Sequence, residues 1–379
     1  MAPLYQQITQ YILDEIRSGR LVSGDRVPSE KELAEKFNVS RITSKKALET
    51  LVQVNVVERA RGRGSFVSRD LPDLSHLGMQ SAERTQVTTI PHDQRMIGIM
   101  IPDFADAYGV SLLRAVESRC AEHQHFLITK ITHGKRDQEE QAIQALVELG
   151  VEGIIVFPVH GEYYNATLLR LVLGNFPTVI VDRYLKGILA QSVYTDNERA
   201  GLELTRYLLD QGHEQIAFIS TPPENTSTIE DRLRGFTQAY AERQQPVKPG
   251  STLLTLFSTL PGSFSAKNVE TDRNTIREFI LAHPEITAFV ACEYNIALIV
   301  RQAILSLGKR IPEDYAIACF DHPNNEFGEI LFTHIQQNET LMGETAVDLL
   351  IDQIAGKQGP THQIIDFQLM EGASTPKRR

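Results

Sequence analysis

Apolar residues near the start of the chain recur at helical spacing. Leu4, Ile8, Ile12 and Ile16 are each four residues apart and predict an amphipathic helix, which the run Ser18-Gly19-Arg20 would end. The polar positions between them would face solvent. The chain therefore opens with a helix that needs a partner for its apolar face.

Two further short helices are expected before residue 54. Ser29 would cap the first of them, because its hydroxyl and the Glu32 carboxylate have the spacing of a reciprocal capping box. Ser40 would cap the second, whose inward face carries Ser44, Ala47, Leu48 and Leu51. This pattern leaves Ile42, Lys45, Lys46 and Glu49 on the outward face, with Arg41 and Thr43 at its flanks.

A short helix followed by one with a basic outward face is typical of a helix-turn-helix, with the second of the two entering the major groove of DNA. Residues 56–59 and 65–67 then predict the two arms of a hairpin. Gly62 and Gly64 would let its tip approach a sugar-phosphate backbone, where Arg61 and Arg63 can neutralise phosphates or enter the minor groove.

Residues 69–94 lack lasting periodicity and predict a linker, and after Arg95 strands and helices alternate. The expected strands are residues 97–101, 126–131, 153–157, 178–181, 215–219, 252–256, 287–291 and 315–319. Helices are expected between them, for example at residues 112–122, 138–149, 198–211, 232–243 and 295–307. Repeated βα units with nearly continuous apolar strands indicate an α/β fold whose parallel sheets are covered on both faces.

Length and composition are consistent with this division. The 379 residues, 42% of them apolar, suit two or three folded domains. No apolar run is long enough for a membrane span, and the first residues lack the pattern of a signal peptide. Cys120, Cys292 and Cys319 are few and widely spaced, which favours buried free thiols and a cytoplasmic location.

The two parts of the chain differ in net charge. Residues 1–70 hold 12 Lys and Arg against 9 Asp and Glu, whereas the whole chain has a net charge of −10. Between Arg41 and Arg69, seven basic residues stand against Glu49 and Glu58 alone. Such a segregated patch indicates phosphate contact, and a solvated charged face is the plainer alternative.

Polar and aromatic side chains follow several predicted strands. Asp103, Phe104 and Tyr108 follow the first strand, Asp182 and Arg183 the fourth, Glu293 and Tyr294 the seventh, and Asp321 and His322 the eighth, while Arg232 would open a helix. Ligands of α/β folds bind outside the carboxyl ends of the strands. Carboxylates and a guanidinium beside aromatic rings suit a small polyhydroxylated ligand, although each residue alone could be a helix cap or a loop ion pair.

These motifs carry a family resemblance. The stretch 3–67, with Pro28-Ser29-Glu30, Leu33-Ala34, Val39-Ser40-Arg41-Ile42-Thr43 and a wing at 62–67, resembles the GntR-type winged helix-turn-helix. The family often has arginine where this chain has Lys31 and Lys45, and lysine cannot form arginine's bidentate contact with guanine. The expected DNA-binding residues are Ser29, Lys31, Ser40, Arg41, Thr43, Lys45, Lys46, Arg61, Gly62, Arg63 and Gly64.

The stretch from about 96 to 370 resembles the LacI-type effector domain, which is related to two-lobed periplasmic sugar-binding proteins. Matching segments include residues 97–103, 151–155, 179–183, 194–197, 212–219, 232–236 and 311–314. A GntR-type head on such a body resembles the arabinose repressor group. The resemblance implies a fold of a winged helix-turn-helix followed by two lobes with doubly wound parallel sheets.

The resemblance also places an effector between the lobes. Its expected contacts are Phe104, Tyr108, Asp182, Arg183, Arg232, Glu293, Tyr294 and Asp321. Tyr294 stands where the family usually has an aspartate that grips the ligand, with Glu293 beside it. Either Glu293 takes over that role, or the effector differs from a plain pentose or hexose.

The sequence thus predicts a homodimeric repressor that binds a palindromic operator in double-stranded DNA and is released by a sugar or sugar derivative. No nucleophile elbow, Walker loop or zinc spacing is found, so no catalysis, cofactor or metal is expected. The alternatives are a GntR-headed enzyme, which a bound pyridoxal chromophore would reveal, and a solute-binding protein that does not bind DNA.

The expected boundaries are a DNA-binding domain at 1–69, a linker at 70–95, an effector-binding and dimerisation domain at 96–371 and a disordered tail at 372–379.

Overall fold

The computed structural model describes residues 4–60, 64–69, 71, 95–103, 107–160, 165–323 and 328–375. The chain divides into two compact units, Met1–Asp93 and Gln94–Arg379. The division falls two residues before the expected start of the second domain at residue 96. Of the expected linker at 70–95, only residues 71 and 95 are described.

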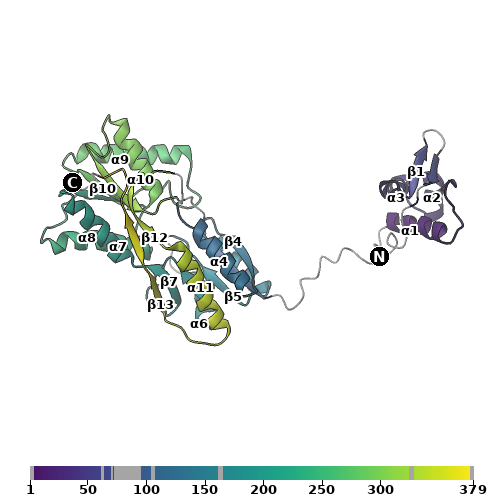
Figure 1. The fold of residues 1–379 in the computed structure, drawn as a ribbon, viewed down its shortest axis with the longest axis horizontal. Helices are drawn as coiled ribbons and strands as arrows, with labels where there is room; N and C mark the ends of the chain where they lie inside the picture. Colours follow the sequence, from purple (N-terminus) through teal and green to yellow (C-terminus); the bar gives the residue numbers. More distant parts are fainter. Residues whose placement is uncertain are drawn as a thin grey trace. The chain divides into compact units, whose positions relative to one another are not determined.

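The first unit contains three helices and a hairpin among its described residues (Figure 1). They are α1 (Leu4–Arg17), α2 (Glu30–Phe37), α3 (Arg41–Gln53), β1 (Val57–Ala60) and β2 (Gly64–Val67). The expected helices and hairpin are confirmed. The core combines Ile8 and Ile12 of α1 with Leu48 and Leu51 of α3, all of them buried.

The second unit contains two lobes with one six-stranded sheet each. Lobe 1 has the strand order β13-β7-β6-β5-β3-β4, and lobe 2 has the order β14-β12-β11-β10-β8-β9. The lobe 1 strands are β3 (Met96–Ile101), β4 (Phe126–Ile131), β5 (Gly153–Val156), β6 (Thr178–Val181), β7 (Gln191–Thr195) and β13 (His362–Ile365). The lobe 2 strands are β8 (Ile216–Ile219), β9 (Thr252–Leu253), β10 (Ala288–Ala291), β11 (Ala316–Phe320), β12 (Thr333–Gln337) and β14 (Phe367–Met370).

All strand pairs in these two sheets are parallel except β12 with β14. The parallel, doubly wound architecture expected from the sequence is therefore confirmed, with one antiparallel edge strand. The eight expected strands are present, although β9 ends at Leu253. The strands β7, β12, β13 and β14 were not predicted.

Helices cover both faces of each sheet (Figure 1). In lobe 1 they are α4 (Val110–Glu122) and α11 (Glu339–Ile354) on one face and α5 (Arg136–Glu148) and α6 (Ala166–Leu173) on the other. In lobe 2 they are α7 (Asn197–Asp210) and α8 (Ser227–Glu242) packed together, and α9 (Ala266–Ala282) and α10 (Tyr294–Ser306) packed together. Helix α8 begins five residues before Arg232, so the expectation that Arg232 opens a helix is wrong.

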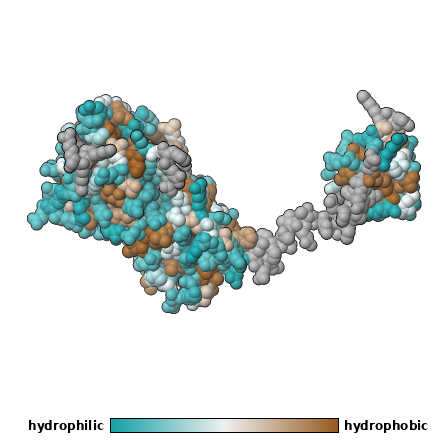
Figure 2. Space-filling view, in the orientation of Figure 1, coloured by the Kyte–Doolittle hydropathy of each residue, from teal (hydrophilic) through white to brown (hydrophobic). Residues whose placement is uncertain are grey.

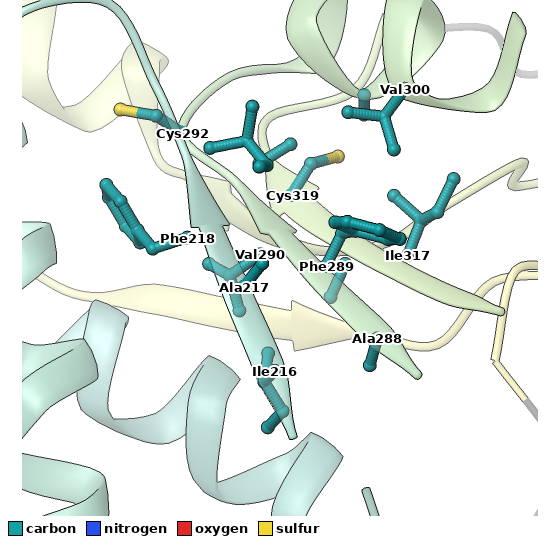
Figure 3. Close-up of a cluster of buried hydrophobic side chains, with 14 of the residues drawn as sticks. Ile216, Ala217, Phe218, Ala288, Phe289, Val290, Cys292, Val300, Ile317 and Cys319 are labelled. Carbon is teal, nitrogen blue, oxygen red and sulfur yellow. The ribbon is translucent and has the colours of Figure 1, made fainter. Parts of the chain in front are cut away.

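The sheet of lobe 2 and the helices that cover it form the largest apolar cluster among the described residues. In Figure 3, Phe218 of β8 lies beside Val290 of β10, and Phe289 of β10 lies beside Ile317 of β11. All four are fully buried. The visible surface in Figure 2 is largely hydrophilic, with hydrophobic residues in separate groups.

Residues 372–375 are packed against lobe 2, so the expectation of a disordered tail from residue 372 is wrong for these four. Ser374 and Thr375 are both buried. The Ser374 hydroxyl accepts a hydrogen bond from the Thr333 amide at 3.0 Å, and the Thr375 hydroxyl is 3.1 Å from that of Tyr207. These bonds tie the segment to β12 and α7. Residues 376–379 lie outside the described part.

Candidate functional site

The start of α3 is held by a side-chain cap. The Ser40 hydroxyl accepts a hydrogen bond from the Thr43 amide at 3.2 Å and lies 2.8 Å from the Thr43 hydroxyl. Ser44, which faces inward, donates its hydroxyl to the Glu30 carbonyl of α2 at 2.7 Å. The cap and this bond fix the position of the first turn of α3 relative to α2.

The basic residues of the two helices lie on the surface of this unit. Arg41 is exposed, and Lys31 and Lys45 form only long contacts with Glu35 and Glu49, at 3.9 and 3.8 Å. Exposed ion pairs at this spacing contribute a few tenths of a kcal/mol, about 0.3–0.5. Both lysines can therefore exchange these partners for a phosphate at little cost.

Two expected DNA-binding residues have specific roles within the fold. The Ser29 hydroxyl accepts a hydrogen bond from the Glu32 amide at 3.3 Å, while the Glu32 carboxylate accepts one from the Ser29 amide at 2.7 Å. This is the predicted capping box. The Lys46 ammonium lies over the Tyr5 ring, 4.5 Å from its centroid, so it leans toward α1.

An ion pair links the hairpin to α2. Arg59 of β1 forms an ion pair with Glu30 at 3.1 Å, and Ala60 pairs with Gly64 across the two strands. Gly64 has a φ of 111°, a conformation that residues with a side chain rarely adopt, which explains a glycine at this position. Arg61, Gly62 and Arg63 lie outside the described residues.

A cleft of about 750 Å³ opens between the two lobes of the second unit. Seven of the eight expected effector residues line it, namely Tyr108, Asp182, Arg183, Arg232, Glu293, Tyr294 and Asp321. The eighth, Phe104, lies outside the described residues. The fold thus brings together residues that are up to about two hundred positions apart in the sequence. They were expected near one another because they follow the carboxyl ends of the predicted strands.

Two aspartates occupy matching positions in the two lobes. Asp182 follows β6 and Asp321 follows β11, and these strands hold the same place in their sheets. Both have left-handed backbones, with φ of 68° and 64°, and both donate their amide to the adjacent strand. Aspartate tolerates this conformation better than most residues. The matching turns point one carboxyl group from each lobe to the cleft.

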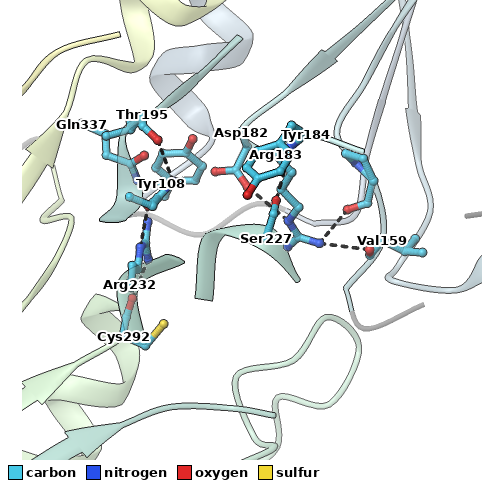
Figure 4. Close-up of polar contacts among 12 residues, drawn as sticks. Tyr108, Val159, Asp182, Arg183, Tyr184, Thr195, Ser227, Arg232, Cys292 and Gln337 are labelled. Carbon is cyan, nitrogen blue, oxygen red and sulfur yellow. Dashed lines mark hydrogen bonds and ion pairs between the residues drawn. The ribbon is translucent and has the colours of Figure 1, made fainter. Parts of the chain in front are cut away.

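Arg232 is buried and held on several sides (Figure 4). It donates from Nε to the Asn197 side chain at 2.8 Å and from one terminal nitrogen to the Cys292 carbonyl at 2.6 Å. Its guanidinium also lies 3.9 Å from the centroid of the Phe320 ring. A planar group fixed in this way can present its remaining N–H groups to a ligand at low entropic cost.

Arg183 has a similar arrangement on the side of lobe 1. One terminal nitrogen donates to the carbonyls of Pro158 and Val159 at 3.1 and 3.0 Å, and Nε contacts Asp182 at 3.3 Å (Figure 4). The cleft thus holds two oriented guanidinium groups. Each is paired with backbone carbonyls of its own lobe.

Burial changes the protonation of the acidic groups in the cleft. Burial raises the pKa of Asp321 to about 8, although the nearby Arg232 lowers it, and burial also raises the pKa of Glu293. The Asp321 carboxyl group is therefore largely protonated at neutral pH. In that state it can donate a hydrogen bond as well as accept one.

Sequence reasoning missed three residues that organise this site. Gln337, at the end of β12, donates its amide to both carboxyl oxygens of Asp321 at 3.1 and 3.0 Å, and its Oε1 has no partner among the described residues. Asn197 holds Arg232, and Glu339 accepts from the Gly109 and Leu112 amides at the start of α4. Gln337 ends β12, Glu339 follows it and Asn197 follows β7, and apolar runs revealed neither of these two strands.

Among the described residues, no group of three metal-ligating side chains is found and no helix is long and apolar enough to span a membrane.

Each of the two units matches the model of a known protein family. Residues 4–67 match the model for bacterial regulatory proteins of the gntR family, and residues 205–375 match a periplasmic binding protein-like domain. The chain joins a GntR-family head to a periplasmic-binding-protein-like body. The GntR-family match covers the capped helices and the described strands of the hairpin, and the second match covers lobe 2 from the middle of α7 onward, together with α11 and β13.

Several known proteins are similar to this chain. The arabinose metabolism transcriptional repressor of Geobacillus stearothermophilus is 28% identical over 358 residues, which cover 93% of this chain and 91% of the relative. The transcription regulator CcpA of Lactococcus lactis has a similar fold, with a TM-score of 0.65 and 18% identity over 75% of this chain and all of that one. A CelR–cellobiose complex matches 92% of this chain and all of its own, with a TM-score of 0.64 and 19% identity.

Proposed function

We propose that this protein is a sequence-specific transcriptional repressor of sugar-utilisation genes that leaves its operator when a sugar-like effector binds between the two lobes. One observation carries the proposal. A single chain combines an exposed, capped and basic helix in a GntR-family head with a cleft lined by oriented polar groups in the body. The name of the arabinose repressor relative supports the same function.

In the proposed complex, α3 lies in the major groove. Arg41 and Lys45 contact bases or phosphates, Lys31 contacts the backbone from α2, and the hairpin tip with Arg61 and Arg63 reaches the flanking backbone. The chain acts as a homodimer, so that two heads bind the inverted half-sites of a palindromic operator.

In the proposed effector site, hydroxyl groups of the ligand pair with the carboxyl groups of Asp182, Asp321 and Glu293. Arg183 and Arg232 donate to its oxygens, and the rings of Tyr108 and Tyr294 cover its apolar face. The effector releases DNA only if it binds one arrangement of the lobes better than the other. Coupling of this kind is commonly about 1–3 kcal/mol.

The first experiment tests the head. Arg41→Ala and Lys45→Ala are expected to weaken operator binding about tenfold or more without changing the melting temperature, because each removes a contact made only with DNA. Binding is measured by gel shift at two salt concentrations. Lys267→Ala, an exposed lysine of α9 in the body, serves as the control. Unchanged affinity in both head variants would refute the role of α3.

The second experiment tests the cleft. Thermal-shift screening with arabinose, ribose and cellobiose identifies a stabilising sugar, since ligands that bind the folded state raise its melting temperature. Asp182→Ala and Arg232→Ala should keep operator binding and lose release by that sugar. Asp182→Asn, which preserves shape, covers the case in which a truncation disturbs folding. Normal release in Asp182→Asn and Arg232→Ala together would refute the site.

A further inference from the structure

The outward face of α3 carries an exposed apolar residue in the first turn of the helix. Ile42 is the second residue of this helix and is 79% exposed. The other large apolar residues exposed in the described part of the same unit, Leu4 and Val22, are 52% and 54% exposed. Ile42 therefore stands out within a domain that buries its other isoleucines.

The position of Ile42 on the helix follows from the buried residues. Ser44, Ala47, Leu48 and Leu51 define the inward face. With 3.6 residues per turn, Ile42 lies about 170° away from their mean direction. It thus points directly away from the core of the unit, whereas Arg41 and Lys45 lie to one side of it.

The neighbours of Ile42 are polar, so nothing in its own helix covers it. Lys45, Lys46 and Glu49 are all exposed on this face. The Ser40 cap holds the first turn, and it is the first turn of a recognition helix that meets the base edges. An isoleucine there cannot hydrogen-bond to any base. The apolar group that the major groove offers is the C5-methyl of thymine.

Resting on the proposed function, we propose that Ile42 reads a thymine in each operator half-site by packing its side chain against the thymine C5-methyl group. The charged residues beside it fix the helix against the backbone and contact the polar base edges. Ile42 then makes the specificity at one position depend on the thymine methyl group, an apolar group that the hydrogen-bond donors of the basic residues do not recognise.

The test uses the full-length protein and an operator selected from random duplexes. Each thymine of the half-site is replaced in turn by deoxyuridine, which removes only the methyl group. One replacement should weaken binding of the unaltered protein about fourfold per half-site, the value expected for one buried methyl group. With Ile42→Ala, the same replacement should have no effect, while replacements elsewhere act equally on both proteins.

Two control variants, Val22→Ala and Arg41→Ala, accompany the test variant. Ile42→Ala is expected to fold, because alanine favours helices more than isoleucine does. Val22→Ala removes exposed apolar surface away from α3 and should leave the effect of every replacement unchanged. Arg41→Ala should weaken all duplexes without removing the deoxyuridine effect.

The inference is overturned if every deoxyuridine replacement acts equally on the unaltered protein and on Ile42→Ala while both bind DNA. It is also overturned if Ile42→Ala lowers self-association in sedimentation instead of changing the deoxyuridine effect. If the unaltered protein selects no duplex even at low salt, the proposed function fails, and the inference fails with it.

Discussion

At the scale of single residues, the cleft contains a carboxyl group whose pKa is raised by burial. Asp321 is buried and accepts a hydrogen bond from the side-chain amide of Gln337. The nearby Arg232 lowers its pKa, whereas the nearby Glu339 and Asp182 raise it. Burial dominates and brings the pKa to about 8. An aspartate in an unfolded chain has a pKa near 3.9.

This difference predicts a dependence of stability on pH. Between about pH 4 and pH 8 the folded protein holds a proton on Asp321 that the unfolded chain has lost, so this group's contribution to stability falls as the pH rises. Asp321→Asn, which mimics the neutral form, should therefore stabilise the protein at pH 8 more than at pH 5. Thermal unfolding at both values measures the difference.

Other buried acids contribute to the pH dependence of the unaltered protein, so only the comparison with the variant isolates Asp321. The exposed Asp137 of α5 provides the matched control, because Asp137→Asn should not change the pH dependence. If Asp321→Asn and the unaltered protein have parallel profiles, the carboxyl group is already ionised at neutral pH.

The sequence predicted this site only in part. Asp182 and Asp321 could be found because each follows a continuous apolar strand. Gln337 could not, because β12 reads Thr-His-Ile-Gln-Gln and its polar residues hide a strand in the interior of a sheet. The same reason explains why β7, with the sequence Gln-Ser-Val-Tyr-Thr, was missed. Asn197 and Glu339 start the helices that follow these two strands.

At the scale of elements, the close packing of α7 and α8 positions Arg232. A Cβ atom on Gly235 would lie 2.0 Å from the Glu198 carbonyl oxygen, and one on Gly201 would lie 2.4 Å from that of Arg232. Both contacts are with backbone atoms, which cannot rotate away. The two glycines therefore let α8 approach α7 closely enough for Arg232 to reach Asn197.

Gly235→Ala is expected to destabilise the protein by about 3 kcal/mol, since overpacked interiors typically lose about 1–3 kcal/mol and here the helix backbones must separate. Separation also moves Arg232, one turn earlier on α8, so affinity for the effector should fall. Urea unfolding and ligand titration measure the two effects. Gln238→Ala, on the exposed face of α8, is the control and should change neither quantity. Wild-type stability in Gly235→Ala would show that the helices can separate without cost.

At the scale of the whole second unit, the two lobes are linked by segments of the chain that cross from one lobe to the other, and by direct contacts. The chain leaves β7 of lobe 1 to form α7 on the sheet of lobe 2, and it leaves β12 of lobe 2 to form α11 on the sheet of lobe 1. Each crossing ends at a residue that holds the partner helix, Asn197 for α8 and Glu339 for α4.

The lobes also contact each other at the rim of the cleft. Tyr184, which follows β6 in lobe 1, donates its hydroxyl to Asp231 of α8 at 3.2 Å, and its amide donates to the Ser227 hydroxyl at 3.3 Å. His160 lies 3.1 Å from the Pro222 carbonyl, and burial lowers its pKa to about 4, so its ring is neutral and donates this bond. These contacts join the two lobes directly.

Tyr184→Phe tests whether closure limits effector affinity. The variant removes one hydrogen bond between the lobes, while Asp231 keeps its bond to Arg234. A single hydrogen bond is worth about 1 kcal/mol, so affinity for the sugar found by thermal shift should fall about fivefold, because less of the protein is in the binding-competent state. Calorimetric titration measures this change. Tyr194→Phe is the control, because it removes the same hydroxyl group from a neighbouring ring whose centroid is 5.0 Å from that of Tyr184. This variant should bind the sugar normally. Equal affinity in all three proteins would mean that the ligand contacts, and not the rim, determine closure.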